Sequence, residues 1–102
     1  MQAASPKTPG EVLDYTIDYY KELEPGEAIA TSTWALSGQD ESLALGEGSY
    51  AATNDDTSVT LWLTNGTAEV TYTATNYMAT DATPPRVFER SFEIFITEKV
   101  SV

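Results

Sequence analysis

The sequence lacks two residue types on which much protein chemistry depends, because it contains no cysteine and no histidine. Without cysteine the chain can form no disulfide and no thiolate metal site. Without histidine it has no imidazole base, no Ser-His triad and no imidazole metal ligand. No stretch approaches the ~20 apolar residues of a membrane span, and no apolar signal-peptide segment follows Met1. These absences favour a soluble, non-enzymatic protein, and we expect no catalytic residue, metal or cofactor.

Basic residues are also scarce. There are 5 Lys and Arg against 16 Asp and Glu, which gives a net charge of −11 on 102 residues. Nucleic acids and anionic membranes are bound by clustered cations, so we expect the chain to bind neither. The length corresponds to a single domain, since domains of ~100–150 residues are the commonest. The excess of carboxylates should keep free copies apart by mutual repulsion.

Hydrophobic residues beyond Gly10 recur with a period of two, and the Thr, Val, Tyr, Trp and Phe among them suit a pleated sheet. We predict strands at residues 11–20, 27–36, 58–64, 68–79 and 87–98, with a weaker short strand at 49–53. Residues 19–23 could form one helical turn. Short strands spaced by roughly 8–12 residues are typical of a sandwich or barrel. We therefore predict an all-β fold, a single immunoglobulin-like β-sandwich over residues 11–102.

Local signals add detail to this fold. Asn65-Gly66 predicts a hairpin turn after the strand at 58–64, because both residues accept positive φ. Tyr72 follows it and resembles a tyrosine corner, in which a buried hydroxyl pins the loop entering its strand. The alternative is an ordinary core tyrosine. In the predicted strand at 27–36, alternation places Trp34 on one face and Ile29 on the other.

Residues 1–10 are small and polar, with Pro6 and Pro9 and no apolar anchor. Such a segment is either a flexible tail or an arm that becomes ordered on a partner. Proline reduces the entropy that an extended arm loses on docking. We predict an extended N-terminal arm without a core of its own, with both prolines as candidate partner contacts.

Four aromatic residues lie opposite the main apolar faces of their predicted strands: Tyr20, Trp62, Tyr77 and Phe95. An aromatic side chain on a nominally polar face can anchor a partner, so we predict these residues as partner-binding. The alternative is that these strands are buried on both faces. We expect one of Trp34 and Trp62 to belong to the core and the other to lie near an interface.

Two groups of polar residues could in principle carry chemistry. Asn54-Asp55-Asp56 offers oxygen ligands for Ca²⁺, but it lacks the alternating ligands and the closing bidentate glutamate of a calcium loop. We interpret it as a turn whose side chains satisfy backbone amides. Glu89 and Glu93 share one strand face, whereas a glycosidase needs two carboxyls across a cleft. Neither group predicts a site.

Several short segments resemble a group of small virion proteins of tailed phages, usually described as fibre–tail adaptors or tail/neck connectors. They are residues 9–11, 12–15, 32–34, 59–63 with the following Asn65-Gly66, and 72–76, together with Arg86, Arg90, Ser91, Ile94 and Ile96. The resemblance covers residues 9–97. It departs at Pro84-Pro85, where the pattern has a Gly-Arg turn, and at Tyr19-Tyr20, where an Asp-Trp pair is usual.

The resemblance implies a non-catalytic connector that bridges the tail tube, hub or neck to fibres or spikes, and it carries over no catalytic residue. It also implies a place in the virion tail or neck after synthesis in the host cytoplasm, with other tail, neck and fibre proteins as partners. Because copies repel one another, we expect a protein that is mainly monomeric alone and forms a ring on a heterologous platform. The alternative is a carbohydrate- or surface-binding β-sandwich module, which would require a planar row of exposed aromatics.

Overall fold

The computed structural model describes residues 5–98, which form eight strands and two short 3₁₀ helices. The strands are β1 (Ser5–Lys7), β2 (Leu13–Asp18), β3 (Ile29–Ser37), β4 (Leu43–Leu45), β5 (Thr53–Asn54), β6 (Ser58–Asn65), β7 (Thr71–Thr80) and β8 (Val87–Ile96), and the helices are η1 (Tyr20–Glu22) and η2 (Gly48–Tyr50). The five main predicted runs correspond to β2, β3, β6, β7 and β8, with ends shifted by a few residues. The all-β prediction is confirmed. Among the described residues, no helix has the length and apolar character needed to span a membrane.

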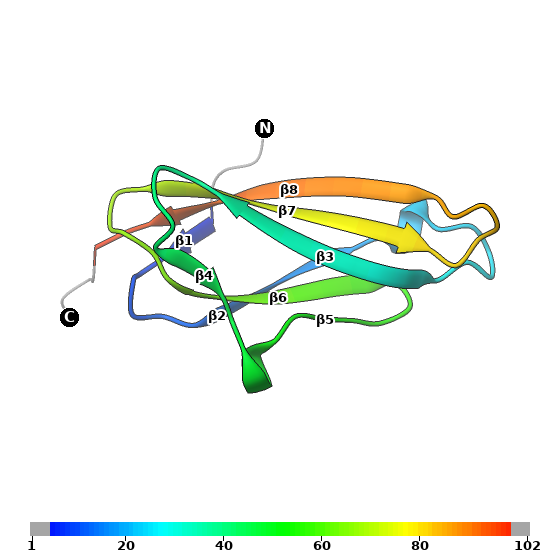
Figure 1. Cartoon of the computed structure of the whole chain (residues 1–102), viewed down its shortest axis with the longest axis horizontal. Coiled ribbons are helices and arrows are strands. Elements are labelled where there is room, and N and C mark those ends of the chain that lie inside the picture. The colour runs from blue at the N-terminus through cyan, green and yellow to red at the C-terminus, as the bar shows by residue number, and fades with distance from the viewer. Residues whose placement is uncertain (1–4, 99–102) are drawn as a thin grey trace.

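The strands form two sheets. Sheet A has the order β1-β8-β7-β3, and sheet B has the order β2-β6-β4, with β5 also paired to β6. All pairs are antiparallel except β1–β8, which is parallel. Figure 1 shows β7 and β8 in one layer above β2 and β6 in the other, with both layers elongated along the 50 Å axis of the molecule. The architecture therefore has two layers, each with one inner and one outer face.

The core lies between the two sheets. Alternate residues of β6 and β7 are buried, as the period of two predicts. The fully buried hydrophobic side chains from the two sheets are Val59, Leu61 and Leu63 of β6, Tyr72, Ala74 and Met78 of β7, and Ile94 and Ile96 of β8. They form two clusters, and the half-buried Trp34 packs against both. Trp34 is therefore the core tryptophan of the two.

The Asn65-Gly66 turn has the predicted backbone but does not form a hairpin. Both residues have positive φ, 64° and 106°. However, β6 belongs to sheet B and β7 to sheet A, so the chain crosses between the layers here. A Cβ on Gly66 would lie 2.7 Å from Ile96 Cδ1, so glycine lets the crossing pack directly on the core. The predicted hairpin is wrong because positive φ specifies a tight turn but not the pairing of its flanking strands.

Two further predictions need correction. The short strand expected at 49–53 is replaced by η2, and the strand β5 begins only at Thr53. In β3 the register shifts between Ile29 and Thr31, which leaves Ala30 as the extra residue of a bulge. An extra residue inverts the alternation. Ile29 is therefore buried on the same side as Trp34, contrary to the prediction.

Part of the predicted arm belongs to sheet A. Residues 5–7 form β1, and Lys7 is fully buried. Its Nζ donates to the carbonyl oxygens of Thr8 at 2.9 Å and Asn65 at 2.6 Å. Lys7 is therefore part of the core, because β8 offers residues 5–7 a pairing edge and the crossing turn offers the ammonium group an acceptor. Residues 1–4 of the predicted arm lie outside the described residues.

Candidate partner-binding surfaces

A buried tyrosine fixes the loop by which the chain crosses between the sheets. The Tyr72 hydroxyl accepts a hydrogen bond from the Thr67 N–H at 3.0 Å and donates one to Asp40 Oδ1 at 2.5 Å. Asp40 also accepts from the Ser42 N–H and the Thr67 hydroxyl. The Tyr72 hydroxyl, followed by these two donors, lowers the pKa of Asp40. The prediction that the Tyr72 hydroxyl holds the loop entering its strand is confirmed. Through Asp40, the same hydroxyl also holds the loop that follows β3.

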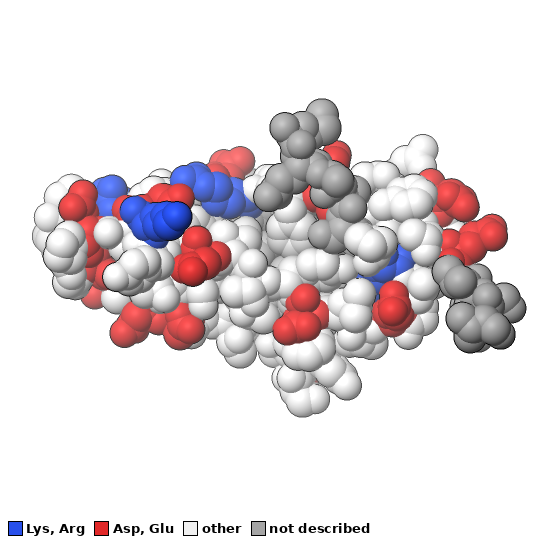
Figure 2. Space-filling model, turned by 180° about the vertical axis from the view of Figure 1, so that it is seen from behind, with Lys and Arg blue, Asp and Glu red and all other residues white. Residues whose placement is uncertain are grey.

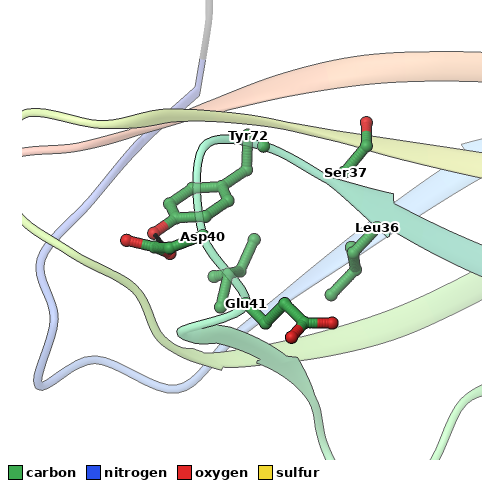
Figure 3. Close-up of a pocket in the computed structure, with 7 residues that line it drawn as sticks. Leu36, Ser37, Asp40, Glu41 and Tyr72 are labelled. Carbon is green, nitrogen blue, oxygen red and sulfur yellow. Dashed lines mark hydrogen bonds between the residues drawn. The ribbon is translucent and has the colours of Figure 1, made fainter.

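A pocket of about 360 Å³ opens beside this tyrosine. Its lining consists of Leu36, Ser37, Gly38, Asp40, Glu41, Leu43 and Tyr72. A Cβ on Gly38 would lie 2.5 Å from the Tyr72 ring, so glycine permits this close approach. Figure 3 shows the Asp40 carboxylate at the Tyr72 hydroxyl, whereas the Glu41 carboxylate points away from it. The pocket therefore combines the apolar side chains of Leu36 and Leu43 with a carboxylate, that of Glu41, which points away from the Tyr72 hydroxyl.

Trp62 lies half-buried on the outer face of sheet B, between the inward-facing Leu61 and Leu63 of β6. Tyr50 of η2 packs edge-on against it, with ring centroids 5.1 Å apart and planes at 60°. Tyr50 remains 44% exposed. A Cβ on Gly46 would lie 2.5 Å from Tyr50 O, so glycine at this position permits the close approach of the loop. We call this pair the Trp62–Tyr50 surface; its inclined rings do not provide the planar row that a sugar-binding module would need.

Three of the other predicted residues lie on the outer face of sheet A. Pro6 of β1 is exposed and pairs with Phe95 of β8, which is half-buried. Tyr77 of β7 is 43% exposed. The register sets Thr71 opposite Phe95, so Tyr77 lies six residues further along β7, about 20 Å away. These residues share a face with one another but not with Trp62.

The last two predicted residues lie at the loops. Tyr20 begins η1 and is 69% exposed. Pro9 is half-buried in the turn after β1, where the Glu11 N–H donates to Thr8 O and Glu11 Oε1 accepts from the Thr8 N–H. The structure therefore distributes the six predicted residues over both outer faces and the loops rather than gathering them into one site.

An ion pair that the sequence did not reveal holds the loop before β3 to the loop before β8. Arg86 donates to both carboxylate oxygens of Glu27, and it also donates to the carbonyl of Glu22 at 2.8 Å. The bond from Arg86, together with one from the Glu24 N–H, lowers the pKa of Glu27 to about 2. The same pairing raises the pKa of Arg86. Arg86 and Glu27 are 59 residues apart, so no local pattern could have connected them.

Charge is distributed unevenly over the molecule. Between Lys21 and Arg86 the sequence contains carboxylates but no lysine or arginine. This stretch supplies β3, β4, β5, β6 and β7. Figure 2 shows that the cations on the back of the molecule gather mainly toward one end, whereas carboxylates occur along the whole face. The side formed by β3, β4 and β5 therefore carries no basic side chain from its own strands.

The acidic turn at Asp55 is a backbone cap. Its Oδ1 accepts from the N–H groups of Thr57 and Ser58 and from the Ser58 hydroxyl, and these bonds lower its pKa. The interpretation as a turn is confirmed. Within residues 5–98, no group of three or more carboxylates is placed to hold a metal ion. Glu89 and Glu93 are exposed on the outer face of β8.

Most of the chain matches a known protein family. The model of a family described as "Podophage GP4 fiber-tail adaptor protein gp77" matches residues 7–95. The match begins at the last residue of β1 and ends within β8, so it spans both sheets. No curated protein matches the chain. The chain therefore belongs to the Gp77 family of podophage fibre–tail adaptor proteins.

Proposed function

We propose that this protein is a non-catalytic structural component of the phage virion that bridges the tail tube, hub or neck to fibres or spikes. The observation that carries the proposal is the family match over residues 7–95. We place the protein in the virion tail or neck after synthesis in the host cytoplasm. On this proposal its partners are other tail, neck and fibre proteins, and it binds neither nucleic acid nor membranes.

An adaptor must contact two partners at once, and the two-layer architecture is suited to this. The Trp62–Tyr50 surface belongs to the outer face of sheet B, whereas Pro6, Tyr77 and Phe95 belong to the outer face of sheet A. Partly exposed aromatic side chains that are already held by packing lose little entropy on binding and commonly anchor interfaces. We therefore assign the two faces to different partners.

The loops and the N-terminal segment provide further contacts in this proposal. Tyr20 and Pro9 lie outside the two faces and are assigned as peripheral contacts. We also propose that residues 1–10 act as an arm that contacts a neighbouring chain, with residues 11–102 as the adaptor domain. The pairing of β1 with β8 would then orient the arm along sheet A.

The two sheets are proposed to form an immunoglobulin-like sandwich. Two features support this. The core is shared between facing sheets, and the Tyr72 hydroxyl bonds to the backbone of Thr67 five residues earlier, which is the bond of a tyrosine corner.

The charge of the chain suggests how copies assemble. A net charge of −11 opposes self-association, because scattered cations cannot neutralise a neighbouring copy. We propose that the protein is mainly monomeric alone and that several copies form a ring on a platform supplied by a different protein. Association with that platform should weaken as salt screens charges over ~8–10 Å.

Sedimentation of the purified chain at micromolar concentration, followed by its addition to phage tails that lack it, tests the proposal. We expect a monomer in solution and stoichiometric incorporation into the tails. A stable ring of the protein alone that persists at high salt, or failure to incorporate, would contradict it.

The Trp62→Ala variant tests the assigned anchor on sheet B. We expect it to remain folded but to lose incorporation, because Trp62 faces outward rather than into the core. Thr64→Ala, two residues along the same face of β6, is the control and should incorporate normally. Normal incorporation of Trp62→Ala would remove Trp62 from the interface.

A further inference from the structure

The sheets present edge strands that differ in how well they are protected from pairing with another chain. Proteins protect such edges with short strands, charges, prolines, bulges or coverage. The strands β4 and β5 are short, with three and two residues. The strand β2 carries Asp14 and Asp18, and β8 carries Glu89, Arg90 and Glu93 and is partly covered by β1. Among the described strands, each of these edges therefore has at least one protective feature.

Beyond the bulge at Ala30, the strand β3 lacks these protective features. It is nine residues long, lies at the end of sheet A and contains no charged residue and no proline (Figure 1). The bulge at Ala30 and the bond from Ile29 N–H to Asp56 O close its first end. From Thr31 to Ser37 it pairs with β7 on one side, and no described strand pairs with its other side. On the unpaired side of a strand, the N–H and C=O groups of alternate residues point away from the sheet and can pair with an extended chain. The Thr33 carbonyl of β3 also accepts a hydrogen bond from Asn76 Nδ2.

The surroundings of this edge determine which chain would fit. At its C-terminal end the edge leads into the pocket lined by Leu36, Tyr72 and Glu41 (Figure 3). Asp40 is already engaged by Tyr72, whereas Glu41 is exposed and makes no hydrogen bond within the described residues. The strands and loops around the edge come from the stretch of sequence without lysine or arginine. The complementary side chain for this pocket is therefore a basic one.

We propose that the edge of β3 from Thr31 to Ser37 docks an extended segment of a different protein, which adds as a strand to sheet A and places a lysine or arginine in the pocket beside Glu41. Main-chain hydrogen bonds supply affinity in this mode of recognition, and the charged side chain sets the register. A second copy of this chain is a poor occupant, because its own β3 has no cation and is surrounded by the same carboxylates. The inference rests on the proposed adaptor function and names the chemistry of one of its partners.

A synthetic peptide of alternating Thr and Val, as long as β3 and with two lysines at each end, tests this inference on the full-length chain. Amide hydrogen exchange should show new protection in β3 but not in β2 or β8. A peptide with glutamates in place of the lysines should bind at least about tenfold more weakly, because like charges then meet at the pocket. N-methylation of alternate peptide amides should abolish the protection.

Matched charge reversals locate the contact. Glu41→Lys should weaken binding of the lysine peptide by about three- to fivefold, as expected when a surface ion pair is replaced by repulsion. Glu93→Lys on β8 changes the net charge equally and should bind like the native protein. The inference is overturned if millimolar lysine peptide protects no β3 amide, if protection appears at another edge, or if both reversals act alike. These measurements use no other phage component, so peptide binding and tail incorporation can fail independently. Failure of peptide binding would overturn this inference, whereas failure of tail incorporation would contradict the proposed adaptor function.

Discussion

Replacing Tyr72 with phenylalanine should destabilise the protein although it removes a single oxygen atom. The ring is 1% exposed, so phenylalanine keeps the packing of the core. The substitution removes the acceptor of the Thr67 N–H and a donor to Asp40. The comparison with the native protein therefore measures the contribution of the hydroxyl group alone.

The magnitude follows from the groups left behind. Asp40 and Thr67 are both exposed residues, so the groups left behind can bond to water and the cost is that of the lost hydrogen bonds. A hydrogen bond of this kind contributes about 0.5–1.5 kcal/mol. For a domain of this size that corresponds to a fall in melting temperature of roughly 5 °C. Tyr72→Ala is less informative, because truncating a buried aromatic costs about 3–5 kcal/mol and could approach the whole stability of a small domain.

Thermal and urea denaturation followed by circular dichroism measure this effect, with Tyr77→Phe as the matched control. Tyr77 is 43% exposed, so its hydroxyl should contribute no more than about 0.5 kcal/mol. A pH series adds a second readout. The pKa of Asp40 is lowered in the folded protein, so its contribution is present above its ordinary value of 3.8 and is lost as the pH falls through the folded value. The difference between native protein and Tyr72→Phe should therefore shrink in acid. Equal melting temperatures for the two at pH 7 would refute the assigned role of the hydroxyl.

Two further polar contacts join residues that are far apart in the chain. The pKa of Glu27 is about 2, whereas its ordinary value is 4.5. The stability that its pairing with Arg86 contributes is therefore present above pH 4.5 and is lost as the pH falls through about 2. The urea midpoint of Glu27→Gln should vary less over this pH range than that of the native protein, and equal variation would argue against the ion pair. Lys7→Ala removes the ammonium group bonded to Asn65 O and should lower the free energy of unfolding by about 1–3 kcal/mol. The control Lys21→Ala, at an exposed position, should leave stability nearly unchanged. Equal stability of the two variants would show that β1 does not support the crossing turn.

Part of the candidate site was predictable from sequence and part was not. The outward position of Trp62 follows from alternation along a regular strand, which is why it could be predicted. Tyr50 could not be, because it lies in a 3₁₀ turn to which no strand period applies; only Gly46 and Gly48 marked that segment as irregular. The pairing of Arg86 with Glu27 and the burial of Lys7 depend on contacts between residues far apart in the chain.

By itself the sequence determined the secondary structure class, the inward faces of β6 and β7 and the role of Tyr72, because these depend on side-chain alternation and on chemistry within a few residues. Its lack of cysteine and histidine excluded thiolate and imidazole chemistry, because composition alone decides which side chains are present. The tertiary structure decided which strands pair. Asn65-Gly66 has the same positive φ values in a hairpin as in a crossing between sheets, and burial of β6 and β7 against each other selected the crossing. The free edge of β3 is likewise a property of sheet order, which no local pattern encodes.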